Sequence, residues 1–495
     1  MTQTYETKPI RIVQALVIAV LGAAVWAFVI VSGVMSRTYD GGIFLSTVAG
    51  IRSGLPLYSG VWDNKDPLFY GTMTAFSSVA PVLGFVMDWL WIALAAFGTI
   101  LIARQVVSTA TVVLLGVVVT PFLILGPAYE PGLTNTPGTA VALLCLGLLI
   151  NRSWLWAGVA MGLLLFVKVL AFPVVVLCAL VLLAFPSLRR GLVRVGLGLL
   201  AAVAAVLALM AAFGWLPGYL TMLQRNRDYS GDVIAYFGFE DSPMGHLTKF
   251  GQEWGSSQRL AGIALLVILV AGVVSILVRR GRTTAEETLI VVWLGAAAIG
   301  VLGVLSISYV WLHHAQALSL LAILAAIVAA LIVEPIRWRL VGWVAILIAA
   351  FILSGWPSPA AIVEEFNARK DAFPAAIAAV NEVSPEARLL NTVPAAKFTF
   401  ARFGSNDDGG FLADVRSGAT LGCPEFHAYD FSPPETFSRL YACAETVDVI
   451  VKTDSFDVFG NGGVGPSVRP ILDYVAANFD CLDVDARQLC IRKGF

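Results

Sequence analysis

The chain has 495 residues, of which 58% are hydrophobic and 13% charged, and its formal net charge is -1. A mean hydropathy of +0.83 lies outside the range of soluble globular proteins and indicates a protein that crosses a membrane several times. The sequence has neither an excess of basic residues nor a long basic block, which argues against nucleic-acid binding.

The first apolar run, Ile12 to Val34, exceeds the roughly 7 to 15 residues of a signal-peptide core and predicts an uncleaved first span. Arginines between the later runs predict the orientation, because basic loops stay in the cytoplasm. With every arginine cluster inside, the chain crosses the inner (plasma) membrane eleven times, its N-terminus is cytoplasmic and its last residues lie outside. The predicted spans are 12–34, 86–103, 108–127, 137–150, 154–168, 170–186, 191–213, 259–278, 285–308, 313–333 and 340–356.

One apolar segment, Trp154 to Phe185, is too long for a single crossing. A helix rises about 1.5 Å per residue, and the hydrocarbon core is about 30 Å thick. Arg152 and Arg189 face the same side of the membrane only if the segment crosses twice. The sequence therefore predicts two short spans with a break near Pro173.

The predicted fold is a polytopic α-helical membrane domain over residues 1–356, followed by an extracytoplasmic α/β domain over 357–495. Two polar loops, about 35–85 and 214–258, also lie outside. In the first loop, "GGIFLSTVAGIRSG" and "DPLFYGTMTAFSSVAPVLGF" have helical apolar spacing and predict helices at the membrane interface.

The last 139 residues mix helical and strand patterns, with helices in "EEFNARKDAFPAAIAAVNEV" and "SVRPILDYVAANF" and strands in "ARLLNTV" and "TVDVIVKTD". An even set of four cysteines in this polar region predicts two disulfides in an oxidising compartment: Cys423, Cys443, Cys481 and Cys490. We favour Cys481 with Cys490, because "FDCLDVDARQLCIRK" alternates like a hairpin, which leaves Cys423 with Cys443. A zinc site is the alternative, but no CxxC spacing occurs.

Asp40 follows the first span and precedes Gly41 and Gly42. An ionisable residue at the end of a span is a candidate site residue, and the two glycines would let a ligand approach the backbone. The alternative is that Asp40 caps the following helix.

The stretch "YDGGIFLSTVAGIRSGLPLYSGVWDNKDPLFYG" resembles the first extracytoplasmic loop of the GT-C superfamily of membrane glycosyltransferases. The likeness is to the branch that contains protein O-mannosyltransferases and the lipid A aminoarabinose transferase. That branch has an acidic residue after the first span, a turn like "GLPLY", and a lysine-proline motif before an aromatic-rich helix. Here these elements are Asp40, "RSGLPLY" and "NKDPLFYG", which contains Lys65. Asp66 stands at the position of the first proline, and this is a departure from the pattern.

Four later motifs occur in the order found in that family, so the resemblance covers roughly residues 1–350. "LGPAYEPGLTNTPG" brings Glu130 into the second outer loop, and "GLLLFVKVLAFP" is similar to the lysine-bearing turn between the fifth and sixth spans. "YLTMLQRNRDYSG" and "WLHHAQALSLLAIL" are similar to a basic segment after the seventh span and to the polar start of a late span.

The resemblance implies an inverting glycosyltransferase that moves a sugar from a polyprenyl-phosphate donor to an extracytoplasmic glycan, lipid or protein. Asp40 would be the base that deprotonates the acceptor hydroxyl, and Glu130 would position the acceptor or share a divalent cation with Asp40. We expect no required cofactor and no metal, because the branch mostly works without one. The groups expected to bind the donor phosphate are Lys65, Lys168, Arg225, Arg227, His313 and His314.

Other interpretations stay open at this point. Lys168 would also fit a residue that extends to the outer interface, and the remaining basic residues would fit solvated loop charges or, for the histidines, a helix cap. A lipid-linked-sugar flippase is a rival function, although transporters place ionisable residues near the midplane and often show repeated halves. An O-antigen ligase or polymerase is a second rival function. That function would require catalytic arginine or histidine residues in a large late loop and would not require Asp40.

Overall fold

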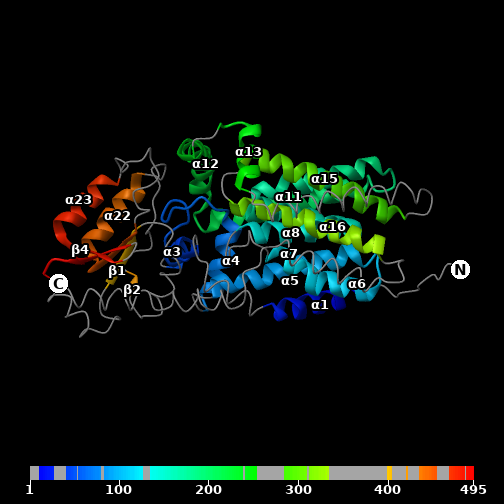
Figure 1. Cartoon of the computed structure of the whole chain (residues 1–495), viewed down its shortest axis with the longest axis horizontal. Coiled ribbons are helices and arrows are strands. Elements are labelled where there is room, and N and C mark those ends of the chain that lie inside the picture. Colours follow the sequence, from blue (N-terminus) through cyan, green and yellow to red (C-terminus); the bar gives the residue numbers. More distant parts are fainter. Residues whose placement is uncertain are drawn as a thin grey trace.

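The computed structural model describes residues 11–26, 41–52, 54–79, 83–125, 134–237, 240–253, 284–308, 312–333, 399–403, 420–421, 434–453, 468–484 and 487–494. Within them, a bundle of apolar helices and a small unit of strands and helices lie at opposite ends of the view in Figure 1. The predicted spans 259–278 and 340–356 and the predicted elements in 364–393 lie outside the described residues.

The bundle helices begin and end close to the predicted spans in this part of the chain. One span is a composite, in which a π-helical turn, η1 (Leu115–Val119), joins two short α-helices, and another begins as the 3-10 turn η4 (Leu312–Ala317). The bundle helices are α1 (Ile12–Val25), α5 (Leu83–Ala103), α6 (Thr109–Leu114), α7 (Thr120–Ile124), α8 (Asn135–Ile150), α9 (Trp154–Val167), α10 (Phe172–Leu180), α11 (Gly191–Ala212), α15 (Ala285–Ser308) and α16 (Leu318–Val333).

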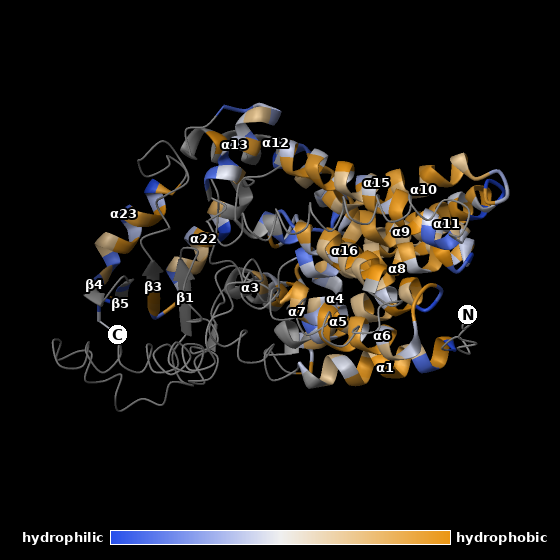
Figure 2. Ribbon diagram, turned by 45° about the vertical axis from the view of Figure 1, so that its right-hand side comes forward, coloured by the Kyte–Doolittle hydropathy of each residue, from blue (hydrophilic) through white to orange (hydrophobic). Residues whose placement is uncertain are grey.

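Two of the described helices, α11 and α15, are long and apolar enough to cross a membrane by length and composition. The other apolar helical stretches are shorter, with 10–17 residues each: Ile12–Ala24, Met87–Ala103, Thr109–Ile124, Asn135–Ile150, Trp154–Val167, Val169–Ala184 and Leu318–Ile332. Apolar residues dominate the whole bundle in Figure 2, on the outside as well as between the helices. Side chains such as Leu197 and Ile299 are exposed, as expected for helix surfaces that face lipid. That each of these helices crosses the membrane stays a prediction.

The long apolar segment after Arg152 is divided, as predicted. α9 ends at Val167, and the 3-10 turn η2 (Val169–Ala171) leads into α10. Pro173 lies in the first turn of α10, where its missing N–H costs no helical hydrogen bond. The break therefore falls at Lys168, which joins α9 to η2.

The helices α9 and α11 pack backbone against backbone. A Cβ atom on Gly158 of α9 would lie 2.0 Å from the carbonyl oxygen of Val195, and one on Gly198 of α11 would lie 2.1 Å from that of Leu155. Glycine spaced four residues apart permits this close approach in membrane helices, and Gly162 completes the pattern on α9.

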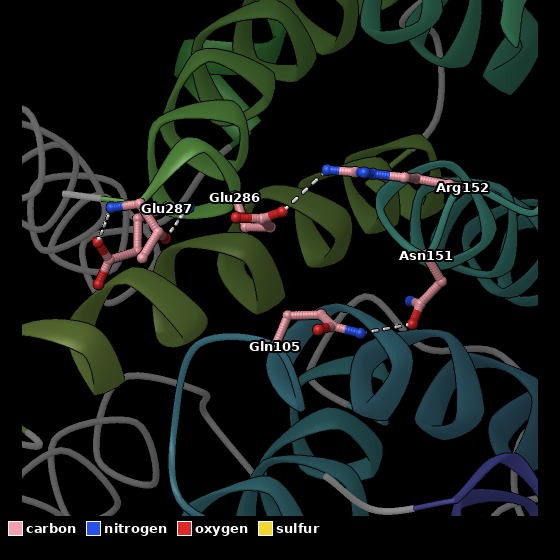
Figure 3. A network of polar contacts seen from close by, with 6 residues as sticks. Gln105, Asn151, Arg152, Glu286 and Glu287 are labelled. Atoms are coloured by element: carbon pink, nitrogen blue, oxygen red, sulfur yellow. Dashed lines mark hydrogen bonds and ion pairs between the residues drawn. The ribbon is translucent and has the colours of Figure 1, made fainter. Parts of the chain in front are cut away.

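A polar network joins α5, α8 and α15 at the end that the arginine clusters predict to be cytoplasmic (Figure 3). Asn151 Oδ1 accepts hydrogen bonds from Gln105 Nε2 at 2.8 Å and from Arg104 Nε at 2.9 Å. Arg152 Nη2 lies 3.3 Å from Glu286 Oε1. These contacts hold the three helix ends together.

The first loop contains two helices, α3 (Gly41–Arg52) and α4 (Pro67–Ser77), where the sequence predicted them. Between them a tight turn over residues 57–61 packs on the start of α12 (Leu216–Phe237). A Cβ atom on Gly218 of α12 would lie 2.8 Å from Tyr58 Cβ, so the contact needs glycine. The helix α13 (Pro243–Glu253) follows α12.

The C-terminal part forms a five-stranded sheet in the order β2-β1-β3-β5-β4. The strands β1 (Thr399–Phe403), β2 (Thr420–Leu421) and β3 (Val449–Thr453) run parallel, while β5 (Arg487–Arg492) runs antiparallel to β3 and to β4 (Phe479–Val484). Two helices, α22 (Pro434–Thr446) and α23 (Arg469–Asn478), bury apolar side chains with the sheet.

The predicted hairpin and its disulfide are confirmed, since Cys481 pairs with Cys490 in register and is bonded to it. Cys443 is also disulfide-bonded, and its predicted partner, Cys423, lies outside the described residues. The predicted strand in "TVDVIVKTD" and the helix in "SVRPILDYVAANF" correspond to β3 and α23. Sequence analysis did not predict β1, β2 or α22.

The close contact of α9 with α11 gives a stability prediction. Gly158→Ala should destabilise the protein by roughly 1 to 3 kcal/mol, because the new methyl group meets the Val195 carbonyl and the helices must separate. Gly196→Ala on α11 is the control: a Cβ there meets no atom within 4 Å, so stability should stay the same or rise slightly. Thermal unfolding in detergent measures both, and equal stabilities for the two variants would contradict the prediction.

Candidate functional site

Lys168 lies at the break between α9 and η2, and its amino group is held by neighbouring segments. Nζ donates a hydrogen bond to Thr134 Oγ1 at 2.9 Å, just before α8 begins. The side-chain stem packs on Gly138 of α8, where a Cβ atom would lie 2.8 Å from Lys168 Cβ and 3.0 Å from Cγ. A larger residue than glycine at 138 would therefore displace the lysine.

A cavity opens beside Lys168, between α8, α10, α15 and η4. Its empty space, including the part that opens to its surroundings, is about 560 Å³. Lys168, His314 and Asn135 are polar groups in its lining, while the rest is mainly apolar, including Val174, Val301, Val304, Leu305 and Leu320. This arrangement suits a ligand that joins a negative charge to an apolar chain.

The turn that precedes α4 supplies a second lysine. The backbone N–H of Lys65 donates to Asp63 Oδ1 at 2.9 Å, and Lys65 Nζ donates to Asn64 Oδ1 at 2.8 Å. Nζ also lies 5.8 Å from the centre of the Phe44 ring of α3, within the range of a cation–π contact. The Tyr58 hydroxyl donates to the Lys65 carbonyl at 2.7 Å. Lys65 is thus held in place by its neighbours.

Asp66 follows Lys65 and is only 8% exposed. Burial raises the pKa of its carboxyl to about 6, although the positive charge of Lys168, a hydrogen bond from the backbone N–H of Val169 and the charge of Lys65 all act to lower it. The Asp66 carboxyl in the first-loop turn therefore lies within electrostatic range of the Lys168 break.

Buried phenols surround the turn. Burial raises the pKa of Tyr58 well above its usual value, and the Asp66 charge adds to the effect. Burial, and then the charge of Asp63, likewise raise the pKa of Tyr70. Both phenols stay protonated at neutral pH, so each can act as a hydrogen-bond donor.

The helix α12 contributes a third wall to this region. Tyr219 lies 5.6 Å from Tyr58 between ring centres, and Asn226 Nδ2 donates to the Asn64 carbonyl at 3.5 Å. Arg225 is half-buried next to Asn226 on the same helix. The basic segment of the predicted outer loop 214–258 thus packs against the first loop.

The structure brings Lys65 and Lys168 within electrostatic range of each other and places Lys168 and His314 in one cavity lining. Arg225 lies on the helix that borders the turn. The other predicted site residues cannot be placed: Asp40 and Glu130 lie outside the described residues, as do the side chains of Arg227 and His313.

Sequence analysis did not identify Asp66, Asp63, Thr134 or Tyr58 as site residues. The sequence did single out Asp66, because it stands where the lysine-proline motif of the family has its first proline. Thr134 and Tyr58 carried no such signal, because their contacts join segments far apart in the sequence or use backbone atoms.

No group of three or more His, Cys, Asp or Glu side chains in the described part of the chain is arranged to hold a metal ion. The predicted carboxylate pair Asp40 and Glu130 lies outside that part, so metal independence stays a prediction.

No known protein-family profile matches the sequence, and no curated protein matches it. Solved structures do match. ArnT from Cupriavidus metallidurans bound to undecaprenyl phosphate aligns with a TM-score of 0.52 and 13% identity over 95% of this chain and 97% of ArnT. The apo state of ArnT gives a TM-score of 0.51 with the same identity and coverage.

The arabinosyltransferase EmbB from Mycobacterium smegmatis aligns with a TM-score of 0.41 and 16% identity over 64% of this chain. The aligned region spans 30% of the length of EmbB. The near-complete coverage of ArnT, by contrast, includes both the helical bundle and the C-terminal part. The chain therefore has the fold of ArnT, in agreement with the resemblance that its first-loop motifs predicted.

Proposed function

We propose that the protein is an inverting glycosyltransferase that takes a sugar from a polyprenyl-phosphate donor and transfers it to an extracytoplasmic acceptor. The observation that carries this proposal is the position of Lys168, a basic residue in the lining of a mainly apolar cavity between helices. A polyprenyl phosphate has the complementary chemistry, with one charged group on a long apolar chain. ArnT, which shares the fold, has been solved with undecaprenyl phosphate bound.

In the proposed complex the donor phosphate lies near Lys168, with Lys65 and His314 as further cationic or hydrogen-bonding groups. The prenyl chain follows the apolar wall formed by Val174, Val301 and other residues of α10 and α15. Hydrogen bonds from charged donors to phosphate oxygens are roughly twice as strong as neutral ones, so these groups anchor the headgroup.

The transfer breaks the bond between the anomeric carbon and the phosphate oxygen, and its electron pair stays on the phosphate. The acceptor hydroxyl oxygen forms the new bond to the anomeric carbon from the opposite face, which inverts the configuration. Its proton passes to a carboxylate, for which we propose Asp40. The leaving phosphate gains negative charge during this step, and nearby lysines stabilise the transition state more than the ground state.

The C-terminal sheet and its helices are proposed to help position the acceptor. Arg439 Nη1 of α22 donates a hydrogen bond to the carbonyl of Ser59, 3.0 Å away, so this part contacts the first loop near the Lys65 turn. An acceptor held between the two would approach the donor sugar from outside.

A transfer assay tests the proposed activity. Purified full-length protein is incubated with radiolabelled polyprenyl-phosphate mannose, arabinose or galactose and with membrane acceptors. We expect transfer from at least one donor, and Asp40→Asn should lower kcat by roughly 100- to 10,000-fold while donor binding survives. Full transfer by Asp40→Asn would favour the ligase interpretation, whereas sugar-lipid movement across vesicles without transfer would favour the flippase.

Lys168 gives a test of donor binding. Lys168→Met should weaken binding of undecaprenyl phosphate by roughly 30-fold or more, because a charged partner of the phosphate is lost. Arg190 is an exposed basic residue directly before α11, so Arg190→Met is the control and should leave the affinity unchanged. Equal affinities for both variants would place the phosphate elsewhere.

Gly138 gives a test of the geometry with the lysine retained. Gly138→Ala should displace the Lys168 stem and raise the donor KM by roughly 10- to 100-fold, since small misplacements of a binding group are costly. Gly295→Ala on α15 is the matched control, because a Cβ there meets no atom within 4 Å. A donor KM that is the same in the two variants would contradict the proposed role of this contact.

A further inference from the structure

Buried polar side chains connect the start of α8 with η4. Gln316 of η4 is only 3% exposed, and its Nε2 donates a hydrogen bond to Thr136 Oγ1 at 2.9 Å and a longer one to the carbonyl of Ile124 at 3.4 Å. Thr136 belongs to the first turn of α8, and Ile124 is the last residue of α7. One side chain thus joins three helical segments.

A second pair of hydroxyl groups extends this connection to the cavity. Ser319 Oγ of α16 donates to the backbone carbonyl of Gln316 at 2.7 Å and lies 3.4 Å from Thr139 Oγ1 of α8. Thr139 is buried and belongs to the cavity lining, as Lys168 does. We call this set of residues the polar seam: Thr136, Thr139, Gln316 and Ser319. The seam therefore borders the cavity through Thr139.

The polar seam also bears on the position of His314. This histidine lies in η4, two residues before Gln316, and it lines the cavity together with Lys168. The turn η4 has six residues of 3-10 helix, a conformation with poorer internal hydrogen bonds than an α-helix. The bond from Gln316 to Thr136 fixes this turn against α8 from outside.

Stability alone does not explain the Gln316 amide. Its second polar atom, Oε1, is buried and has no hydrogen-bond partner within the described residues. The penalty for a buried, unpaired polar atom is comparable with the net stabilisation from two ordinary hydrogen bonds. The amide therefore adds little net stability to the bundle. What it adds is direction, because a hydrogen bond fixes the position of η4 more narrowly than an apolar contact does.

We infer that Gln316 is a positioning residue that holds η4 on the first turn of α8 and thereby keeps His314 in the wall of the cavity that contains Lys168. This inference rests on the proposed function, in which His314 helps to bind the donor phosphate. Gln316 is not part of the described cavity lining, so it acts through His314 and does not touch the donor.

Two substitutions break the bond from opposite sides. Gln316→Met keeps the length of the side chain and removes the amide, while Thr136→Val keeps the shape and removes the hydroxyl. Each should weaken binding of undecaprenyl phosphate to the full-length protein in detergent by roughly tenfold, the value of one hydrogen bond from His314. Thr136→Ser retains the hydroxyl and should retain the affinity.

Thr120→Val is the matched control for a general loss of stability. Thr120 of α7 is fully buried, and its hydroxyl donates to Thr99 Oγ1 of α5 at 3.0 Å. The variant therefore loses one buried hydroxyl bond, as Thr136→Val does, but this bond joins α7 to α5 and not η4 to α8. We expect a lower unfolding temperature for Thr120→Val with an unchanged affinity for undecaprenyl phosphate.

A His314→Ala background shows whether Gln316 acts through the histidine. There, Gln316→Met should change binding by no more than about twofold, since the group that it positions is gone. The same tenfold loss in both backgrounds would show that Gln316 serves the general packing of the bundle, and it would overturn the inference while leaving the proposed function standing.

Hydrogen exchange of the ligand-free protein tests the anchoring without a donor. Gln316→Met should speed amide exchange in the peptide that contains η4, whereas Thr120→Val should leave the exchange of that peptide unchanged. Unchanged exchange at η4 in Gln316→Met would overturn the anchoring role. A wild-type protein that does not bind undecaprenyl phosphate would overturn the proposed phosphate site and, with it, the role of His314 in this inference.

Discussion

The site depends on the cost of keeping one lysine at the edge of an apolar bundle. An ammonium group removed from water loses solvation worth several kcal/mol unless hydrogen bonds and an opposite charge replace it. Lys168 receives one hydrogen-bond acceptor from Thr134 and a nearby negative charge from Asp66. Both partners lie more than 30 residues earlier in the chain, so the lysine requires three separate parts of the chain to meet.

The break in the helix at Lys168 follows from the same need to give the lysine polar partners. A continuous helix from Trp154 to Phe185 would carry the lysine in mid-helix, among lipid or packed apolar side chains. The break at 168–171 instead ends α9 at the lysine and leaves the N–H of Val169 free of an α-helical bond, so that it can donate to Asp66. Gly138 then gives the stem room against α8, at the end of the helix whose opposite end is fixed by Asn151.

Much of the helical framework could be predicted from the sequence, because apolar run length and arginine placement are local signals. The division of 154–185 into two helices followed from its length, the two flanking arginines and Pro173, and the hairpin of Cys481 and Cys490 followed from alternation. For the candidate site, sequence motifs pointed to Lys65 and Lys168, whose role in donor binding stays a prediction. Asp66 was visible only as a mismatch, since its role depends on a turn 100 residues later in the chain.

The unpredicted elements were missed for two different reasons. The strands β1 and β2 are short, and their stability comes from tertiary contacts that a sequence pattern does not display. The helix α22 does carry its buried apolar residues Phe437, Leu440 and Ala444 at helical spacing, a local signal that sequence analysis did not use.

Two helices, α12 and α22, contact the turn of the first loop, and the contact with α22 connects the C-terminal part to this loop. Tyr58 has a φ of 73°, a left-handed conformation that costs a non-glycine residue roughly 1 to 2 kcal/mol. The close approach of Gly218 and the tilted contact with the Tyr219 ring hold it from the α12 side, while Arg439 holds the next carbonyl, that of Ser59, from the α22 side. The Tyr58 hydroxyl in turn fixes the Lys65 carbonyl. Contacts therefore run from α22 through the turn at Tyr58 and Ser59 to Lys65, the residue that precedes Asp66.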